Sequence, residues 1–299
     1  MCCLGDLATA HEHLDLASRL VGASPSPDTL TNSAKVCALA ADALTLWTWG
    51  YPDRAKARLD ELLIFAEATK NPYDLAIAII YAHIVTLFRR EFAQALDYAD
   101  HGLRIASEKQ FEWLETSLVW SRDACRILAG ASCDIKKPQA AFEVYFGSEA
   151  KLYRPDNCTV LAECCGVLGQ AEVGLPMIEE AFSAMNENDE RRCEPETWRV
   201  KGLLLHQLAL RRGGSGGPSE PLAREAESCF IKAIKLANRR QSRSWELRAA
   251  LTFGRILVQS GRRREARDIL VPIHKSFTEG FDTPDFVEAS TPLDELRSA

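Results

Sequence analysis

Apolar side chains recur along the chain with the period of an α-helix, and short turns separate these periodic segments. After a turn, one stripe comprises Ala55, Leu59, Leu62 and Ala66, and another comprises Ala266, Ile269, Ile273 and Phe277. Before a turn, similar stripes comprise Val36, Leu39, Ala43 and Trp47, and Leu247, Leu251, Gly254 and Val258. The pattern predicts pairs of amphipathic helices that each bury one face.

The turns themselves recur with a common signature, a turn residue followed five positions later by alanine or glycine. The turn residues are Gly5, Gly50, Arg90, Gly169 and Gly261. Their spacings of 45, 40, 79 and 92 residues fit one unit of roughly 40 to 46 residues if two intervals each hide an irregular unit. The sequence therefore predicts a helical repeat.

Two segments are expected to be the irregular units. Residues 129–151 predict a longer turn ending at Pro138 and a short second helix interrupted by Gly147. Residues 211–221, within the run "RRGGSGGPSEPLAREA", predict a flexible loop between two helices, because glycine and proline interrupt regular structure there.

A pair of helices cannot bury its apolar faces without neighbouring pairs, so the pairs are expected to stack. We predict an all-α, right-handed superhelical solenoid of about six to seven antiparallel helix pairs. It is expected to occupy residues 1–290, with a C-terminal tail at 291–299.

The two ends of the chain carry separate expectations. The first turn precedes a stripe of Ala10, Leu14, Ala17 and Val21, so the helix before this turn is missing. Residues 11–21 are either an unpaired cap or part of a longer polypeptide, and leucines spread around this helix favour truncation or a partner chain.

The run "GFDTPD" at residues 280–285 reads as the junction between two helices rather than as a ligand loop. Gly280 is expected to adopt a left-handed conformation with Phe281 folded over Phe277, and Thr283 to cap a helix that begins at Pro284 with Asp285 in its first turn. Pro292 is expected to break that last helix.

The helix pairs resemble tetratricopeptide repeats, although the units are longer than is usual for that family. The stretch Ser242–Ala289, "SRSWELRAALTFGRILVQSGRRREARDILVPIHKSFTEGFDTPDFVEA", together with "LWTWGYPDRAKARLDE" and "FRREFAQALDYAD", resembles a particular C-terminal tail. That tail belongs to bacterial multidomain proteins in which a class III adenylate/guanylate cyclase domain, or a helix-turn-helix activator domain, precedes a P-loop ATPase. The resemblance implies a sensing or partner-binding tail, without the chemistry of the head domains.

Composition narrows the possible partners and compartments. The net charge of −6 argues against direct nucleic-acid binding, which needs a basic surface. The most apolar segment, Leu75–Phe88, has 14 residues and contains His83, so it suits a buried helix better than a membrane span. The ten cysteines form no C-x-x-C pair and are interpreted as reduced small hydrophobic residues of a cytoplasmic protein.

No complete catalytic, metal or cofactor constellation is present in the sequence. The glycines of "RRGGSGGPSEP" lack the lysine and hydroxyl residue of a P-loop. His11 and His13 are two apart and do not share a helix face, so they are expected to be solvent-exposed. His83 is expected to be a buried histidine with one hydrogen bond, while His206 and His274 have no nucleophile or acid nearby in sequence.

Partner-binding candidates follow from analogy with tetratricopeptide solenoids, in which the first helix of each pair lines a concave groove for a peptide or protein. The candidates are Trp198, Arg199, Trp245 and Arg248, with packing between repeats as the alternative. A basic patch is formed by Arg239, Arg240, Arg243, Arg262, Arg263 and Arg264. It either offsets helix dipoles or docks an acidic partner or a phosphate of a neighbouring domain.

These observations predict a non-enzymatic, cytoplasmic interaction and regulatory module without a cofactor. Its expected partner is a protein or peptide in the groove, including the cyclase or ATPase domains of a parent or partner chain. Two rival hypotheses stay open: a fragment whose cyclase or ATPase activity belongs to absent domains, and the tail of a transcriptional activator.

Overall fold

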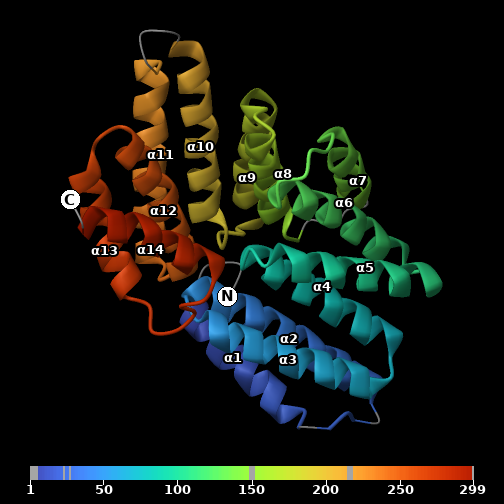
Figure 1. Ribbon diagram of the computed structural model, residues 1–299. Helices are drawn as coiled ribbons and strands as arrows, with labels where there is room; N and C mark the ends of the chain where they lie inside the picture. The colour runs from blue at the N-terminus through green and yellow to red at the C-terminus, as the bar shows by residue number, and fades with distance from the viewer. Residues whose placement is uncertain (1–5, 23, 27, 148–151, 214–217, 298–299) are drawn as a thin grey trace. The chain divides into compact units, whose positions relative to one another are not determined.

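A computed structural model describes residues 6–22, 24–26, 28–147, 152–213 and 218–297, with side chains up to residue 290, and every regular element in these ranges is an α-helix (Figure 1). The prediction of an all-α fold is confirmed. The chain divides into two compact units, unit 1 within residues 6–148 and unit 2 within residues 149–299. None of the described helices is both long and apolar enough to cross a bilayer.

Unit 1 contains seven described helices joined by turns. They are α1 (Leu7–Leu20), α2 (Thr29–Trp49), α3 (Pro52–Thr69), α4 (Pro72–Phe88), α5 (Phe92–Glu108), α6 (Glu112–Leu128) and α7 (Lys136–Phe146). Side-chain caps set several starts: Asp28 accepts a hydrogen bond from Leu30 N at 3.1 Å, and Asn71 accepts one from Tyr73 N at 3.0 Å. The short α7, which ends before Gly147, confirms the short second helix predicted there. The turn before it does not extend to Pro138 as predicted, because α7 begins at Lys136 and Pro138 lies in its first turn, where a proline costs no helical hydrogen bond.

Unit 2 likewise contains seven described helices. They are α8 (Arg154–Val167), α9 (Ala171–Asn188), α10 (Glu194–Gly213), α11 (Glu220–Arg239), α12 (Arg243–Gln259), α13 (Arg263–Lys275) and α14 (Pro284–Arg297). Between α10 and α11 the predicted flexible loop is shorter than 211–221, because α10 continues to Gly213, and its residues 214–217 lie outside the described residues.

Four of the five predicted turn residues are left-handed, which explains the repeat signature, and the fifth, Gly5, lies outside the described residues. Gly50, Arg90, Gly169 and Gly261 have φ values of 97°, 61°, 68° and 78°. Gly130, in the first irregular unit, is also left-handed, with a φ of 93°. It completes a series of left-handed turn residues at positions 50, 90, 130 and 169. A left-handed residue reverses the chain within one step, so each turn folds one helix back antiparallel to the previous one.

Within each unit the even-numbered helices pack on one another as well as on their neighbours in sequence. In unit 1 these contacts join α2 to α4 and α4 to α6, and in unit 2 they join α8 to α10, α10 to α12 and α12 to α14. Across the described residues, no two odd-numbered helices make comparable contacts. Each unit therefore has a continuous layer of even helices, which we call its even layer, flanked by the odd helices.

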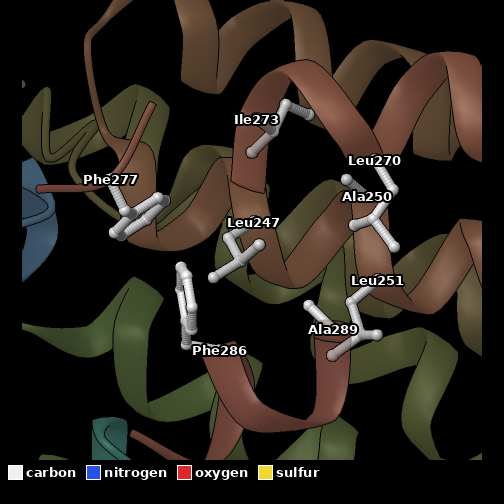
Figure 2. Packing of buried hydrophobic residues seen from close by; sticks show 8 residues of the cluster. All are labelled: Leu247, Ala250, Leu251, Leu270, Ile273, Phe277, Phe286 and Ala289. Carbon is white, nitrogen blue, oxygen red and sulfur yellow. The ribbon is translucent and has the colours of Figure 1, made fainter. Parts of the chain in front are cut away.

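Apolar side chains that face between helices form the cores. At the end of unit 2, Figure 2 shows Leu247 of α12 facing the rings of Phe277 and Phe286, and Leu251 beside Ala289. Fully burying one such side chain stabilises a fold by about 1.5–3 kcal/mol. Glycines let helices approach closely, since a Cβ at Gly202 of α10 would lie 3.0 Å from the Phe230 ring of α11.

The last helix differs from its prediction. α14 runs from Pro284 to Arg297, so it continues through Thr291 and Pro292 instead of breaking there. A proline inside a helix removes one backbone hydrogen bond, and the remaining bonds carry the helix past it. The same holds at Pro176 in α9 and Pro272 in α13.

The junction before α14 partly matches its prediction. Gly280 is left-handed with a φ of 75°, α14 begins at Pro284, and Asp285 lies in its first turn, as expected. Phe281 is exposed and packs against Phe286 at 5.1 Å between ring centroids, rather than covering Phe277. Thr283 donates a hydrogen bond back to the Gly280 carbonyl at 2.7 Å.

Candidate functional site

The most unusual feature of unit 2 is a row of buried and partly buried charges across its even layer. It consists of Glu163 on α8, Glu196 and Arg199 on α10, Arg248 on α12 and Asp285 on α14. We call these five residues the charge ladder. Four of them are buried, and Glu163 is partly buried with a side chain 13% exposed. Buried charges are rare unless they are paired, so four along one layer call for a physical explanation.

The first half of the ladder is centred on Arg199. Its Nε and Nη2 each bind a Glu196 carboxylate oxygen at 2.8 Å, and Nη2 also binds Glu163 Oε1 at 2.6 Å. The Arg199 side chain is only 2% exposed. Burial alone would lower the pKa of Arg199, but Glu163 and Glu196 outweigh it and raise the pKa above its ordinary value.

The second half is centred on Arg248. Its Nε and Nη2 bind Asp285 Oδ2 at 2.8 and 2.6 Å, and its Nη1 lies 3.5 Å from Glu196 Oε1. Burial would lower the pKa of Arg248, whereas the carboxylates of Asp285 and Glu196 raise it overall. Negative and positive groups thus alternate from α8 to α14, and every positive group has carboxylates on two helices.

The ladder contains two of the four partner-binding candidates, and a third packs beside it. Arg199, Arg248 and Trp245 are buried, and the Arg248 guanidinium lies 5.1 Å from the Trp245 ring centroid. The alternative interpretation, packing between repeats, describes the contacts that these side chains make in this structure. Their role in binding a partner stays a prediction.

Trp198 lies away from the ladder, on the side of α10 that faces α9 and α11. Its ring packs against Phe182 with centroids 4.6 Å apart, and Lys232 Nζ lies 3.6 Å from its centroid. The four candidates therefore do not form one surface.

The predicted basic patch is divided between exposed and paired side chains. Arg239, Arg263 and Arg264 are exposed. Arg240 binds Glu194 at 2.7 Å, and Arg243 donates to the Ser276 carbonyl at 3.1 Å.

Arg262 of the same patch binds Glu227 and Glu265. Hydrogen bonds to these carboxylates raise the pKa of Arg262 and lower those of both glutamates. Half of the patch therefore joins neighbouring segments of unit 2, and docking by the patch stays a prediction.

A small cavity of about 190 Å³ lies between α10, α11 and α12. Phe230, Phe253 and Ile256 line it with apolar surface, while Arg224 and Glu227 are among its polar neighbours. His206 also lines it, and burial lowers the pKa of this histidine. Two acidic and two arginine side chains line it, Glu220 and Glu227 with Arg224 and Arg262.

The histidines follow their predictions with one exception. His83 is fully buried, and its Nδ1 lies 2.8 Å from the Ala95 carbonyl, as expected. Burial lowers the pKa of His83 to about 4. His13 is exposed, but His11 is half-buried because its Nδ1 lies 2.6 Å from Asp42 Oδ1 on α2, which corrects the expectation for His11.

The described residues hold no group of three or more histidine, cysteine or acidic side chains arranged to bind a metal, and no disulfide joins their cysteines. His274 Nε2 lies 3.0 Å from Ser290 Oγ, and the His274 ring stacks on Phe286.

No protein-family model matches the chain, and no curated protein matches it.

Sequence reasoning missed the three carboxylates of the ladder. Glu163, Glu196 and Asp285 are 33 to 122 residues apart, so no local motif contains them. One signal was available: Arg199 and Arg248 are both the sixth residue of their helices, α10 and α12. Equivalent arginines on successive first helices of a repeat indicate a shared inter-repeat contact.

Proposed function

We propose that the chain is a non-enzymatic interaction and regulatory module, built as a right-handed tetratricopeptide-like solenoid. The observation that supports this most is the continuous even layer in each unit, with odd helices flanking it. Stacked helix pairs of this kind present extended surfaces that suit a protein or peptide partner. The charge ladder is then the device that fixes the order of repeats within unit 2.

The resemblance of Ser242–Ala289 to the tails of multidomain cyclases and activators supports a more specific proposal. The chain is the sensing or partner-binding element of a cytoplasmic signalling assembly, and the head domains of a parent or partner chain do the chemistry. The mostly buried cysteines suit a reducing compartment.

The test is nucleotide turnover by the purified chain. With ATP or GTP and Mg²⁺, we expect neither hydrolysis nor cyclisation above the level of a heat-denatured sample. Turnover that co-purifies with the chain through successive separations would overturn the non-enzymatic proposal. A cyclase, P-loop or helix-turn-helix domain read in frame upstream of Met1 would identify the parent among the rival hypotheses.

A further inference from the structure

The exposed hydrophobic side chains of unit 1 are gathered at one end of its helices. Because neighbouring helices are antiparallel, the first turns of α2, α4 and α6 lie at the same end as the last turns of α1, α3, α5 and α7. Leu30, Tyr73 and Trp113, in those first turns, are 80%, 40% and 46% exposed. Among the described residues, the opposite end has no large hydrophobic side chain this exposed.

The three residues occupy one repeat position. Each is the second residue of its helix, after the caps Asp28, Asn71 and Phe111 respectively. The even helices that carry them are in contact, and packed helices have axes about 8–10 Å apart. We therefore expect Leu30, Tyr73 and Trp113 to form a row whose spacing follows that of the helix axes, roughly 10 Å.

Specific contacts hold this row in place. Ser33 Oγ of α2 donates to Asp74 Oδ1 of α4 at 2.6 Å, which joins the first turns that carry Leu30 and Tyr73. The Tyr73 and Phe111 rings meet edge to face with centroids 5.6 Å apart, and the Trp113 ring stacks on Tyr145 of α7 with centroids 6.5 Å apart. The row is thus a built surface from α2 to α7.

Further apolar side chains extend the surface on the odd helices. Leu20 of α1, Ile64 of α3 and Val144 of α7 are 79%, 70% and 67% exposed, each in the C-terminal half of its helix. We call this end of unit 1, with the row and these flanking residues, the apolar edge. Exposed apolar side chains that cluster this way are typical of interaction surfaces.

The charges around the apolar edge are predominantly negative. Among the described residues, the acidic side chains in its turns and terminal helical turns are Asp28, Glu67, Asp74, Glu108, Glu112, Glu115 and Glu143, of which Asp74 is buried. The basic ones are Arg19, Lys70 and Lys109, and Arg19 is paired with Asp15 at 2.8 Å. At the opposite end the balance is reversed, with Arg54, Arg90, Arg126, Lys136 and Lys137 against Asp6, Asp53, Glu91 and Asp134.

We propose that the apolar edge binds an amphipathic, basic helix of a partner protein. Residues seven apart on such a helix lie on one face about 10.5 Å apart, which matches the spacing expected for Leu30, Tyr73 and Trp113 from the distance between packed helix axes. Lysine or arginine side chains beside that apolar stripe would face the acidic groups around the edge. This inference rests on the proposed interaction function and names the partner chemistry for unit 1.

The test uses a fluorescent synthetic peptide of roughly 18 leucines and lysines, arranged as an amphipathic helix. The readout is the fluorescence anisotropy of this peptide as the full chain is titrated into it. The edge variant is Leu30→Ser with Tyr73→Ser and Trp113→Ser. The matched control variant is Val167→Ser with Val173→Ser and Val287→Ser, which removes exposed side chains from unit 2. We expect the edge variant to bind at least about tenfold more weakly and the control to stay within about twofold of wild type.

Two further arms test the chemistry of the partner. Replacing lysine by glutamate in the peptide is expected to abolish binding, and Glu108→Lys with Glu112→Lys is expected to weaken binding of the basic peptide. This charge variant also serves if the serine variant does not fold. The proposal is wrong if the basic peptide does not bind wild type, or if the edge variant and the charge variant both bind it like wild type. It is also wrong if the acidic peptide binds wild type as well as the basic peptide does. Nucleotide turnover would overturn the proposed function instead, so the two failures are distinguishable.

Discussion

Removing Arg199 is expected to destabilise unit 2 strongly. The substitution Arg199→Met keeps most of the side-chain volume but leaves Glu163 and Glu196 without their shared guanidinium. Deleting one partner of a buried ion pair costs about 3–5 kcal/mol, because the remaining charge stays buried. Arg248 still lies 3.5 Å from Glu196, so we expect the lower part of that range, about 3 kcal/mol.

The assay is urea unfolding followed by far-UV circular dichroism, with hydrogen exchange on α10 peptides to assign the transition to unit 2. At an m-value of about 1–3 kcal/mol per molar urea, a loss of about 3 kcal/mol lowers the midpoint by about 1–3 M. The control is Arg224→Met, because Arg224 and its partner Glu220 are both highly exposed. We expect that control to shift the free energy of unfolding by less than about 0.5 kcal/mol.

A double variant separates the loss of packing from the cost of unpaired charge. Adding Glu196→Gln to Arg199→Met removes one of the stranded carboxylates, so we expect recovery of about 1 kcal/mol or more. The reasoning about the charge ladder is wrong if Arg199→Met unfolds like wild type. It is also wrong if the second substitution adds its own full cost to the first.

Two further predictions concern unfolding free energies at other positions. Gly202→Ala should destabilise the protein by about 1–3 kcal/mol, because the added Cβ would meet the Phe230 ring at 3.0 Å. Gly254→Ala should stabilise it by about 0.5–1 kcal/mol, because no atom lies within 4 Å of the added Cβ and alanine favours the helix α12. Equal effects of the two substitutions in thermal unfolding would contradict this prediction. Burial lowers the pKa of folded His83 to about 4, so between about pH 6.5 and 4 only the unfolded chain binds this proton. The free energy of unfolding should therefore decrease as the pH is lowered through this range, by about 3 kcal/mol more in wild type than in His83→Gln. Parallel pH profiles of urea unfolding for the two proteins would contradict this prediction.

The helices and turns were predictable because they depend on local sequence. Gly50, Gly169 and Gly261 carry the left-handed conformation that reverses the chain, and the alanine or glycine five residues later permits close packing of the next helix. Gly130 was missed as a turn residue because Ile135, rather than alanine or glycine, lies five positions later, and the connection is longer because α7 begins only at Lys136.

The candidate sites were less predictable because they depend on contacts between repeats. Arg199 and Arg248 were found as candidates, but their burial follows from carboxylates on three different helices, which helical periodicity cannot place. The apolar edge was also missed, because Leu30, Tyr73 and Trp113 are separated by 43 and 40 residues. Aligning the units by their helix starts, rather than by their turn residues, brings these three positions together.

The most direct test of an interaction function is hydrogen exchange of the full chain with and without the basic amphipathic peptide. We expect slower exchange in the first turns of α2, α4 and α6 and the last turn of α7. The turns at residues 50–51, 89–91 and 129–135 are expected to exchange as in the free chain. Unchanged exchange at the apolar edge, or slowing confined to the opposite end of unit 1, would contradict the account.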